Sequence, residues 1–273
     1  MKFSLINGNK AEATKGSRGF CPSCGSELVA KCGEIKVNHW AHKGNRNCDP
    51  WWENETDWHR SWKEKFPIDW QEVIQFDNSG EKHIADVKTE RGCVLEFQHS
   101  YLKPEERRAR NAFYPKLVWV VAGFRRKTDK PQFQKVVKES TVVSMEPLIR
   151  EVSFPEECRL LKEWHDSGAL VFFDFQEAYE LKQSALWFLF PKMSTGEAYL
   201  SPFSRVKFIE LHNNNEFDEI VRNVILPICK TLYSNKQIIR KRIIRVSRNY
   251  VRSNRFSGFQ RYRANKRRKI RRF

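Results

Sequence analysis

The segment that most constrains the fold of this chain is a short, acid-bearing stretch of strand-forming residues. Residues 83–88 and 93–98 are joined by four residues that end in glycine, a pattern that predicts a β-hairpin. Because side chains alternate between the two faces of a strand, Glu96 and Gln98 share one face. Asp86, on the partner strand, can then lie beside Glu96.

Two carboxylates that rigid strands hold close together repel each other. The usual relief is a shared proton or a divalent cation such as Mg²⁺, which prefers hard oxygen ligands. Asp86 and Glu96 therefore predict a metal site. The alternative is a polar strand pair that faces solvent and binds nothing.

The sequence around the hairpin predicts a compact α+β core. Residues 51–66 have helical spacing, and residues 73–76 form a strand before the hairpin. Residues 104–114 begin with proline followed by acids, as a helix start does. Residues 117–122 are almost entirely apolar, which is typical of a strand buried on both faces. The expected order is helix, three strands, helix, strand.

Beyond this core the sequence predicts a second α+β region and a tail. We divide the chain into residues 1–50, 51–123, 124–235 and 236–273. The second region carries no catalytic motif, its aromatic residues favour core packing over base stacking, and it could extend the same sheet. Its expected elements are a charged loop at 124–131, helices at 156–165 and 215–234, and strands at 170–175, 185–190 and 206–211.

The N-terminal region carries cysteine and histidine pairs at knuckle spacing. Tetrahedral Zn²⁺ prefers such sulfur and nitrogen ligands in closed structural sites. We predict Cys21, Cys24, His39 and His42 as the ligands, with Cys48 as a competing ligand. Redox-active or free thiols are the alternative, but the segment around Cys21 is turn-rich and has no thioredoxin-like pattern.

The number of cysteines and the N-terminal sequence both indicate the cellular compartment in which the protein would fold. Seven cysteines, an odd number, favour the reducing cytoplasm over a disulfide scaffold. The first residues lack the apolar core of a secretory signal, and no apolar run reaches the length of a membrane span. We therefore expect a cytoplasmic protein.

Nearly all of the net charge of +17 lies in the last segment, which has sixteen basic residues and no acid. Arginines with interleaved aromatic residues suit phosphate contact and base stacking, so we expect a nucleic acid, and DNA in particular, as the partner. A solvated tail and a membrane-surface helix are the alternatives. The predicted contact residues are Arg240, Arg245, Arg252, Arg255, Arg263, Arg267 and Arg268.

The motifs resemble, in content and order, those of the competence protein CoiA family within the PD-(D/E)XK, or restriction-endonuclease-like, nucleases. The similarity covers roughly residues 1–123. Each motif is short, but their ordered combination is specific. They lie at residues 21–24, 39–42, 55–59, 84–87, 96–100, 105–110, 114 and 118–121.

This resemblance implies roles for individual residues. Asp86, Glu96 and the Phe97 carbonyl would bind Mg²⁺ or Mn²⁺, and Glu55 would complete the metal shell or orient water. Gln98, the fourth expected catalytic residue, would help to arrange the water. It stands where the superfamily often has lysine, and glutamine supplies no positive charge.

Two residues near the expected metal site could supply what Gln98 lacks. Lys63 or His59 could provide the missing positive charge or a proton. His59 has a structural alternative, as a histidine at the edge of the core.

Two hypotheses follow. The first is a metal-dependent nuclease in which the zinc knuckle and the basic tail hold DNA. The second is a catalytically weak or inactive protein of the same fold that binds DNA during uptake, recombination or defence.

Overall fold

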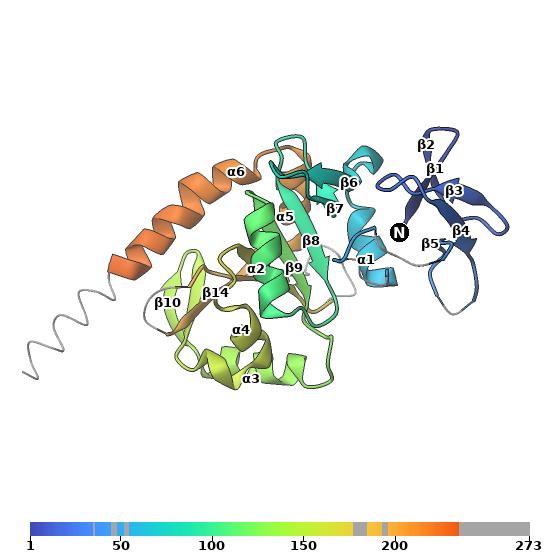
Figure 1. The fold of residues 1–273 in the computed structure, drawn as a ribbon. Helices are drawn as coiled ribbons and strands as arrows, with labels where there is room; N and C mark the ends of the chain where they lie inside the picture. Colours follow the sequence, from blue (N-terminus) through green and yellow to red (C-terminus); the bar gives the residue numbers. More distant parts are fainter. Residues whose placement is uncertain (35, 45–47, 52–54, 177–184, 193–195, 235–273) are drawn as a thin grey trace, which may run out of the picture. The chain divides into compact units, whose positions relative to one another are not determined.

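The computed structural model describes residues 1–34, 36–44, 48–51, 55–176, 185–192 and 196–234. The protein is a mixed α+β structure with two sheets (Figure 1). Met1–Ile220 form one compact unit, and Val221–Phe273 belong to a second. The predicted basic tail, with its seven contact arginines, lies outside the described residues.

A small antiparallel sheet occupies the N-terminal region. Its strand order is β2-β1-β3-β4-β5, and its core contains Leu28 and Trp40, which are fully buried. These strands are short and partly polar, so the sequence indicated only a turn-rich knuckle. The strands are β1 (Phe3–Ile6), β2 (Asn9–Glu12), β3 (Arg18–Phe20), β4 (Glu27–Lys31) and β5 (His39–His42).

The larger sheet has nine strands in the order β10-β11-β14-β13-β12-β9-β8-β7-β6. Strand β9 runs parallel to both β8 and β12, and the other pairs are antiparallel. The boundary that we placed at residue 123 therefore falls inside one continuous sheet. The strands are β6 (Gln71–Phe76), β7 (Lys82–Lys88), β8 (Val94–Gln98), β9 (Leu117–Ala122), β10 (Thr141–Met145), β11 (Leu148–Val152), β12 (Leu170–Asp174), β13 (Ala185–Leu189) and β14 (Ala198–Ser204).

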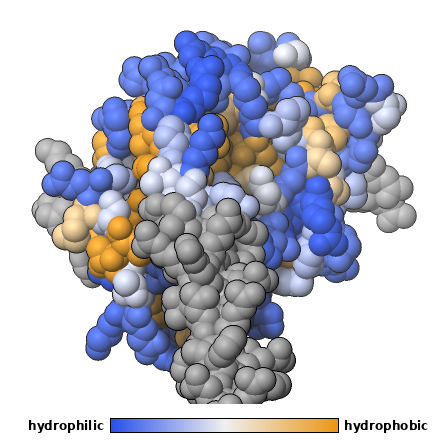
Figure 2. Space-filling model, turned by 90° about the vertical axis from the view of Figure 1, so that its left-hand side faces the viewer, coloured by the Kyte–Doolittle hydropathy of each residue, from blue (hydrophilic) through white to orange (hydrophobic). Residues whose placement is uncertain are grey.

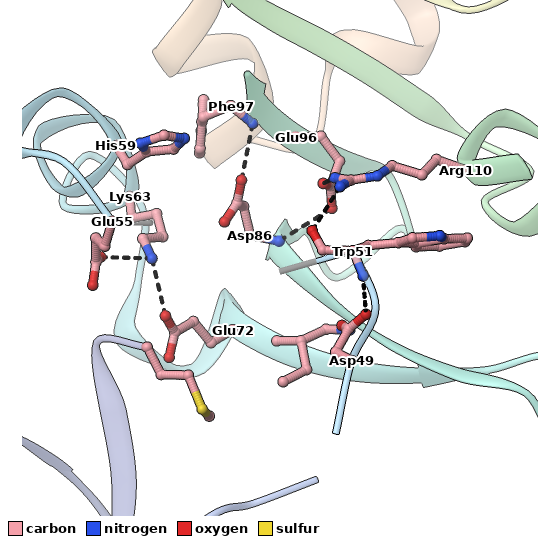
Figure 3. Close-up of a pocket in the computed structure, with 12 residues that line it drawn as sticks. Asp49, Trp51, Glu55, His59, Lys63, Glu72, Asp86, Glu96, Phe97 and Arg110 are labelled. Atoms are coloured by element: carbon pink, nitrogen blue, oxygen red, sulfur yellow. Dashed lines mark hydrogen bonds and ion pairs between the residues drawn. The ribbon is translucent and has the colours of Figure 1, made fainter. Parts of the chain in front are cut away.

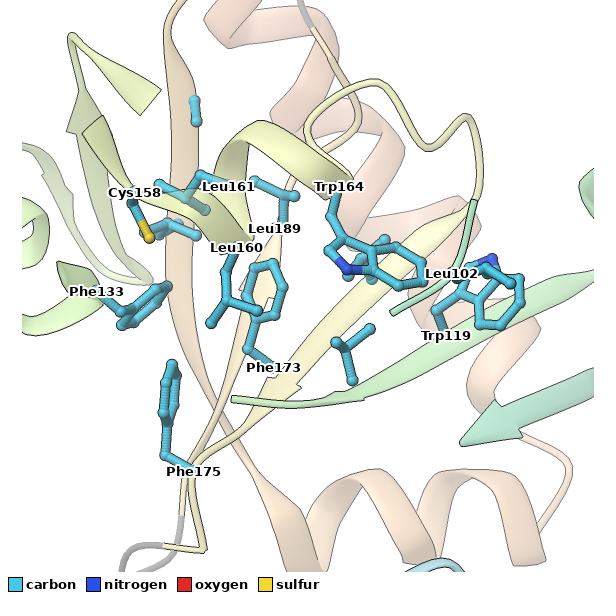
Figure 4. Packing of buried hydrophobic residues seen from close by; sticks show 14 of the residues in the cluster. Leu102, Trp119, Phe133, Cys158, Leu160, Leu161, Trp164, Phe173, Phe175 and Leu189 are labelled. Carbon is cyan, nitrogen blue, oxygen red and sulfur yellow. The ribbon is translucent and has the colours of Figure 1, made fainter. Parts of the chain in front are cut away.

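Helices cover both faces of this sheet because its central strands are buried on both sides. On one face, α2 (Pro104–Phe113), α3 (Asp129–Glu139) and α4 (Arg159–Trp164) pack over a large apolar cluster. Figure 4 shows part of this cluster from close by. In that cluster Trp119 of β9 contacts Trp164, with ring centroids 5.2 Å apart.

The opposite face carries α1 (Asp57–Lys63) and α5 (Arg205–Asn213). There Trp62 of α1 stacks on Phe97 of β8, and Phe172 of β12 contacts Phe208 of α5. The chain order α1, β6, β7, β8, α2, β9 is helix, three strands, helix, strand.

Several of our element predictions are wrong in detail, among them the helix expected at residues 51–66, which the described residues show as α1 (Asp57–Lys63). Residues 206–211 form helix α5 rather than a strand; Ser204 caps its start by accepting the Lys207 amide, and Phe208 and Leu211 are buried at helical spacing. The predicted loop at 124–131 ends in the first turn of α3.

The remaining elements are short helical segments. They are η1 (Ile68–Trp70), η2 (Pro155–Glu157), α6 (Phe217–Ile220), the π-helical η3 (Val221–Ile225) and an α-helix at residues 226–234. No helix among the described residues is both long enough and apolar enough to cross a membrane. Hydrophilic side chains cover most of the face drawn in Figure 2, with apolar patches between them.

Candidate functional site

Strands β7 and β8 separate where the predicted acids stand. Their pairing is limited to Val87 with Leu95 and Lys88 with Val94. At the next position, hydrogen bonds from backbone amides to side chains take the place of hydrogen bonds between the two backbones. The Phe97 amide donates to Asp86 Oδ2 (2.9 Å), and the Asp86 amide donates to Glu96 Oε1 (3.3 Å). Backbone amides that the separation frees thus find partners in the two carboxylates.

A cavity of about 70 Å³ opens at this separation (Figure 3). A bound water needs roughly 10–15 Å³ of such volume, so the cavity has room for a cation with several waters. Five carboxylates and two cationic side chains line it, which leaves negative charge in excess. The lining residues are Met1, Asp49, Trp51, Glu55, His59, Lys63, Glu72, Ile84, Asp86, Glu96, Phe97 and Arg110.

Lys63 projects from α1 into the cavity between two acids. Its Nζ lies 2.7 Å from Glu55 Oε1 and 3.0 Å from Glu72 Oε1, and all three side chains are buried. Burial alone would lower the pKa of Lys63, but the carboxylates of Glu72 and Glu55 raise it above its ordinary value. Lys63 therefore stays charged.

The same interaction keeps the two acids ionised. Burial would raise the pKa of Glu72 and of Glu55, but Lys63 lowers the first to about 2 and the second below its usual value. We predicted that Glu55 lies in the helix, and this is wrong. Glu55 directly precedes the N-cap residue Thr56 and lies two residues before the first residue of α1.

Glu72 is a site residue that our sequence analysis did not identify. Its backbone has φ +47°, a left-handed conformation that is rare for residues with a Cβ. It interrupts the pairing of β6 with β7, and its carboxylate accepts the amides of Lys2 (2.7 Å) and Phe3 (3.0 Å). The local sequence carries no signal of this role, because the amides that it accepts are about 70 residues away and Lys63 lies in another element.

Arg110 of α2 binds the second acid of the hairpin. Its guanidinium donates to Glu96 Oε2 (2.9 Å), to the Trp51 carbonyl (2.6 Å) and to Glu106 (2.6 Å). Burial and the nearby Asp86 nevertheless raise the pKa of Glu96 to about 8. Burial also raises the pKa of Asp86.

The chemical type of these acidic side chains suits a divalent cation, but their oxygen atoms are not gathered closely around one point. Two carboxyl groups with raised pKa values would bind a cation in exchange for their protons. In the part of the chain that the structure describes, however, no three carboxylate oxygens of this cavity lie within 4.8 Å of one another.

The remaining predicted residues lie at or near the cavity. His59 is buried, lines the cavity, and its Nδ1 lies 2.9 Å from Thr56 Oγ1. Gln98 lies outside the cavity lining, and its Nε2 donates to the Ser100 carbonyl (3.2 Å). Among the side chains that line the cavity, Lys63 and Arg110 carry positive charge.

A second constellation brings Cys21, Cys24, His42 and Cys48 within 4.8 Å of one another. The Sγ atoms of Cys21 and Cys48 are 3.5 Å apart, and Cys24 Sγ lies 3.3 Å from His42 Nε2. Ligand atoms of tetrahedral zinc are about 3.5–3.8 Å apart, so these four residues could hold such an ion. Burial raises the pKa of Cys21 to about 12.

His39 lies outside this group, which corrects its place in the predicted ligand set. His39 and His42 are both in strand β5, and residues three apart in a strand point to opposite faces. The ring of His39 instead has Nδ1 2.9 Å from the Val37 carbonyl. Cys48, which we had expected to compete, takes the fourth position.

Comparison with known proteins finds similarity in the N-terminal region. The family described as "Competence protein CoiA, N-terminal domain" matches residues 6–50. The "Competence protein CoiA" of Bacillus subtilis (strain 168) is 44% identical over 46 residues, which are 17% of this chain and 12% of that protein. No solved structure matches the chain. The similarity thus covers the region that contains the cluster of Cys21, Cys24, His42 and Cys48, and over residues 6–50 the chain resembles the N-terminal domain of competence protein CoiA.

Proposed function

We propose that this protein is a metal-dependent nuclease that hydrolyses phosphodiester bonds in DNA, in the cytoplasm. One observation carries the proposal: Asp86 and Glu96 meet where two strands separate, in a cavity with excess acid and a buried lysine. The order of elements around them supports a restriction-endonuclease-like core.

A divalent cation, Mg²⁺ or Mn²⁺, would be held by Asp86, Glu96 and the Phe97 carbonyl. When bound, it would polarise the scissile phosphate and lower the pKa of the attacking water. Asp86 is suited to this role because it is half-buried, with one oxygen fixed by the Phe97 amide.

Lys63 would supply the positive charge that Gln98 does not. Its ammonium lies inside the cavity and its raised pKa keeps it charged, so it can stabilise negative charge that develops on the phosphate. Glu55 holds Lys63 in place and faces the cavity, where it can orient water. His59 can accept or donate a proton there.

The flanking regions would hold the substrate. In this proposal the knuckle of Cys21, Cys24, His42 and Cys48 binds structural Zn²⁺. The basic tail contacts phosphates without reading sequence. Similarity to competence protein CoiA supports a role in the uptake or recombination of DNA.

A cleavage assay tests this function. End-labelled single- and double-stranded DNA, with RNA in parallel, is incubated with Mg²⁺ or Mn²⁺ and either wild-type protein or the Asp86→Ala, Glu96→Ala double variant. We expect cation-dependent products from the wild type and at least a ~100-fold lower rate from the double variant. Asp69→Asn, which changes an exposed acid of η1, is the matched control and should cleave normally.

A non-catalytic DNA-binding protein of the same fold is the second candidate. It is favoured by the contact of Arg110 with Glu96, because a guanidinium already occupies Oε2 of that carboxyl group, where a cation would otherwise bind. This candidate predicts DNA binding that is indifferent to Mg²⁺ and no product on any substrate. Cleavage that survives in the double variant would instead exclude the acids as the catalytic site.

A further inference from the structure

Asp49 connects the two constellations. It follows the cysteine ligand Cys48 directly in the chain, and it lines the acid cavity. Its carboxylate accepts from the Ile84 amide (2.9 Å) and from the Trp51 amide (2.9 Å), and it lies 2.9 Å from His83 Nδ1. One side chain next to the knuckle therefore fixes two adjacent residues of strand β7.

Strand β7 contacts the N-terminal region along one face and carries a catalytic acid on that face. Lys82, Ile84 and Asp86 share a face because they alternate along the strand. Lys82 Nζ donates to the Ser23 carbonyl (2.6 Å), between the two knuckle cysteines, and Ile84 packs against the same apolar cluster as Cys48. Asp86 is the next residue on this face.

A second connection runs from Asp49 to Glu96. Asp49 holds the Trp51 amide, and the Trp51 carbonyl accepts from Arg110 (2.6 Å), which in turn binds Glu96. The Trp51 ring also stacks on His83, with centroids 3.2 Å apart and planes at 8°. The position of Asp49 thus affects the placement of both Asp86 and Glu96.

We propose that Asp49 is a positioning residue that couples zinc occupancy of the knuckle to the geometry of the acid cavity. A zinc ion that binds Cys48 fixes the backbone beside it, and this places the Asp49 carboxylate against β7. Without zinc, the Ile84 amide and the Trp51 segment lose a fixed partner. The separation of β7 from β8 and the orientation of Arg110 then become less well defined. The functional meaning of this coupling rests on the proposed divalent site.

Hydrogen exchange of the full-length protein tests the coupling without reference to activity. Exchange of residues 82–88 and 94–98 is measured in zinc-loaded and chelator-stripped protein. We expect zinc removal to speed exchange in both strands of the wild type. Zinc-loaded Asp49→Asn, whose amide cannot satisfy the same set of donors, should show the faster exchange while retaining its zinc, and zinc removal should then add little.

Two further variants keep this test decisive. His83→Gln removes the imidazole that contacts the Asp49 carboxylate. It serves as the test variant if Asp49→Asn does not fold. Asp69→Asn is the control and should exchange as the wild type does. The proposal would be overturned if the exchange rates in β7 and β8 do not change when zinc is removed. It would also be overturned if these rates in zinc-loaded Asp49→Asn equal those of the zinc-loaded wild type.

Mn²⁺ affinity separates this inference from the function on which it rests. Changes to residues that orient metal ligands typically cost 10–100-fold in metal affinity, so we expect Asp49→Asn to weaken Mn²⁺ binding by that factor. Wild-type protein that binds no Mn²⁺ but shows zinc-dependent exchange refutes the nuclease site and leaves the coupling standing. Normal Mn²⁺ binding by zinc-stripped protein refutes the coupling alone.

Discussion

At the scale of single residues, Arg110 and Asp86 have opposing effects on the pKa of Glu96. Its Oε2 is paired with the buried guanidinium of Arg110, and its Oε1 accepts the Asp86 amide. Burial and the charge of Asp86 nonetheless raise its pKa to about 8. At neutral pH and without a bound cation, this carboxyl group therefore holds a proton for most of the time.

This raised pKa predicts how stability depends on pH in protein that is free of Mg²⁺ and Mn²⁺. Between about pH 4.5 and 8 the folded state keeps a proton at Glu96 that the unfolded state has lost, so the free energy of unfolding falls as pH rises. Since a tenfold change in proton affinity corresponds to about 1.4 kcal/mol, the total loss is on the order of a few kcal/mol.

Urea unfolding of zinc-loaded wild type and Glu96→Gln at pH 5 to 8 measures this contribution. The variant cannot lose the proton, so the wild type should lose stability relative to the variant as the pH rises. Parallel curves for the two proteins would show that Glu96 has an ordinary pKa.

At the scale of secondary-structure elements, helix α1 is held in place by Asp174 at the end of β12. The carboxylate of Asp174 is fully buried and accepts the indole N–H groups of Trp58 (2.9 Å) and Trp62 (2.9 Å). Arg205 of α5 also donates to it. Because α1 carries His59 and Lys63, this contact positions one side of the acid cavity.

Asp174→Ala should therefore destabilise the protein strongly. The change removes a fully buried carboxylate and leaves two buried indole donors and the partly buried guanidinium of Arg205 without their acceptor. Breaking a fully buried pair costs about 3–5 kcal/mol, so we expect a loss toward the lower end of that range. Chemical denaturation measures the loss. Asp57→Asn, an exposed acid in the first turn of the same helix, is the control and should cost less than about 1 kcal/mol. Equal effects from the two variants would contradict the anchoring role of Asp174.

Elements with strong local patterns could be predicted from the sequence, and elements that depend on distant partners could not. The hairpin at residues 82–98 and the apolar strand β9 show the expected periodicity. Helix α5 does not, because its residues 206–211 are rich in strand-forming residues, and contacts of Phe208 with Phe172 and Trp62 favour the helix.

The same limit applies to the site. Asp86 and Glu96 could be expected side by side because acids on adjacent strands are a local pattern, whereas the roles of Glu55 and Lys63 came with the family resemblance; all four line the cavity. Glu72 could not be identified, since its partners Lys2 and Phe3 lie about 70 residues away in the chain. The spacing of His39 and His42 was misleading because it places two ligands together only on a helix.

At the scale of the whole molecule, the charge is divided unevenly along the chain. The last segment holds sixteen basic residues of a chain whose net charge is +17. Phosphate neutralisation by such a segment releases counterions, so affinity for nucleic acid should fall steeply as salt rises.

Removal of residues 235–273 should weaken DNA binding and make its salt dependence shallower. Fluorescence anisotropy with a labelled oligonucleotide, measured from 50 to 300 mM salt, gives the slope. A variant with serine at Tyr250, Phe256, Phe259, Tyr262 and Phe273 keeps the charge and should keep the slope while it loses stacking. A truncated protein with wild-type affinity and slope would show that the tail does not contact DNA.

The most direct test of the account is calorimetric titration of Mn²⁺ into the zinc-loaded protein at pH 7. We predict one Mn²⁺ bound at the acid cavity, with release of a proton because Glu96 must ionise to bind it. Asp86→Asn should weaken binding at least 10-fold, and Asp69→Asn should not change it. Absence of Mn²⁺ binding, or equal affinity in Asp86→Asn and wild type, would contradict a divalent-cation site at Asp86 and Glu96.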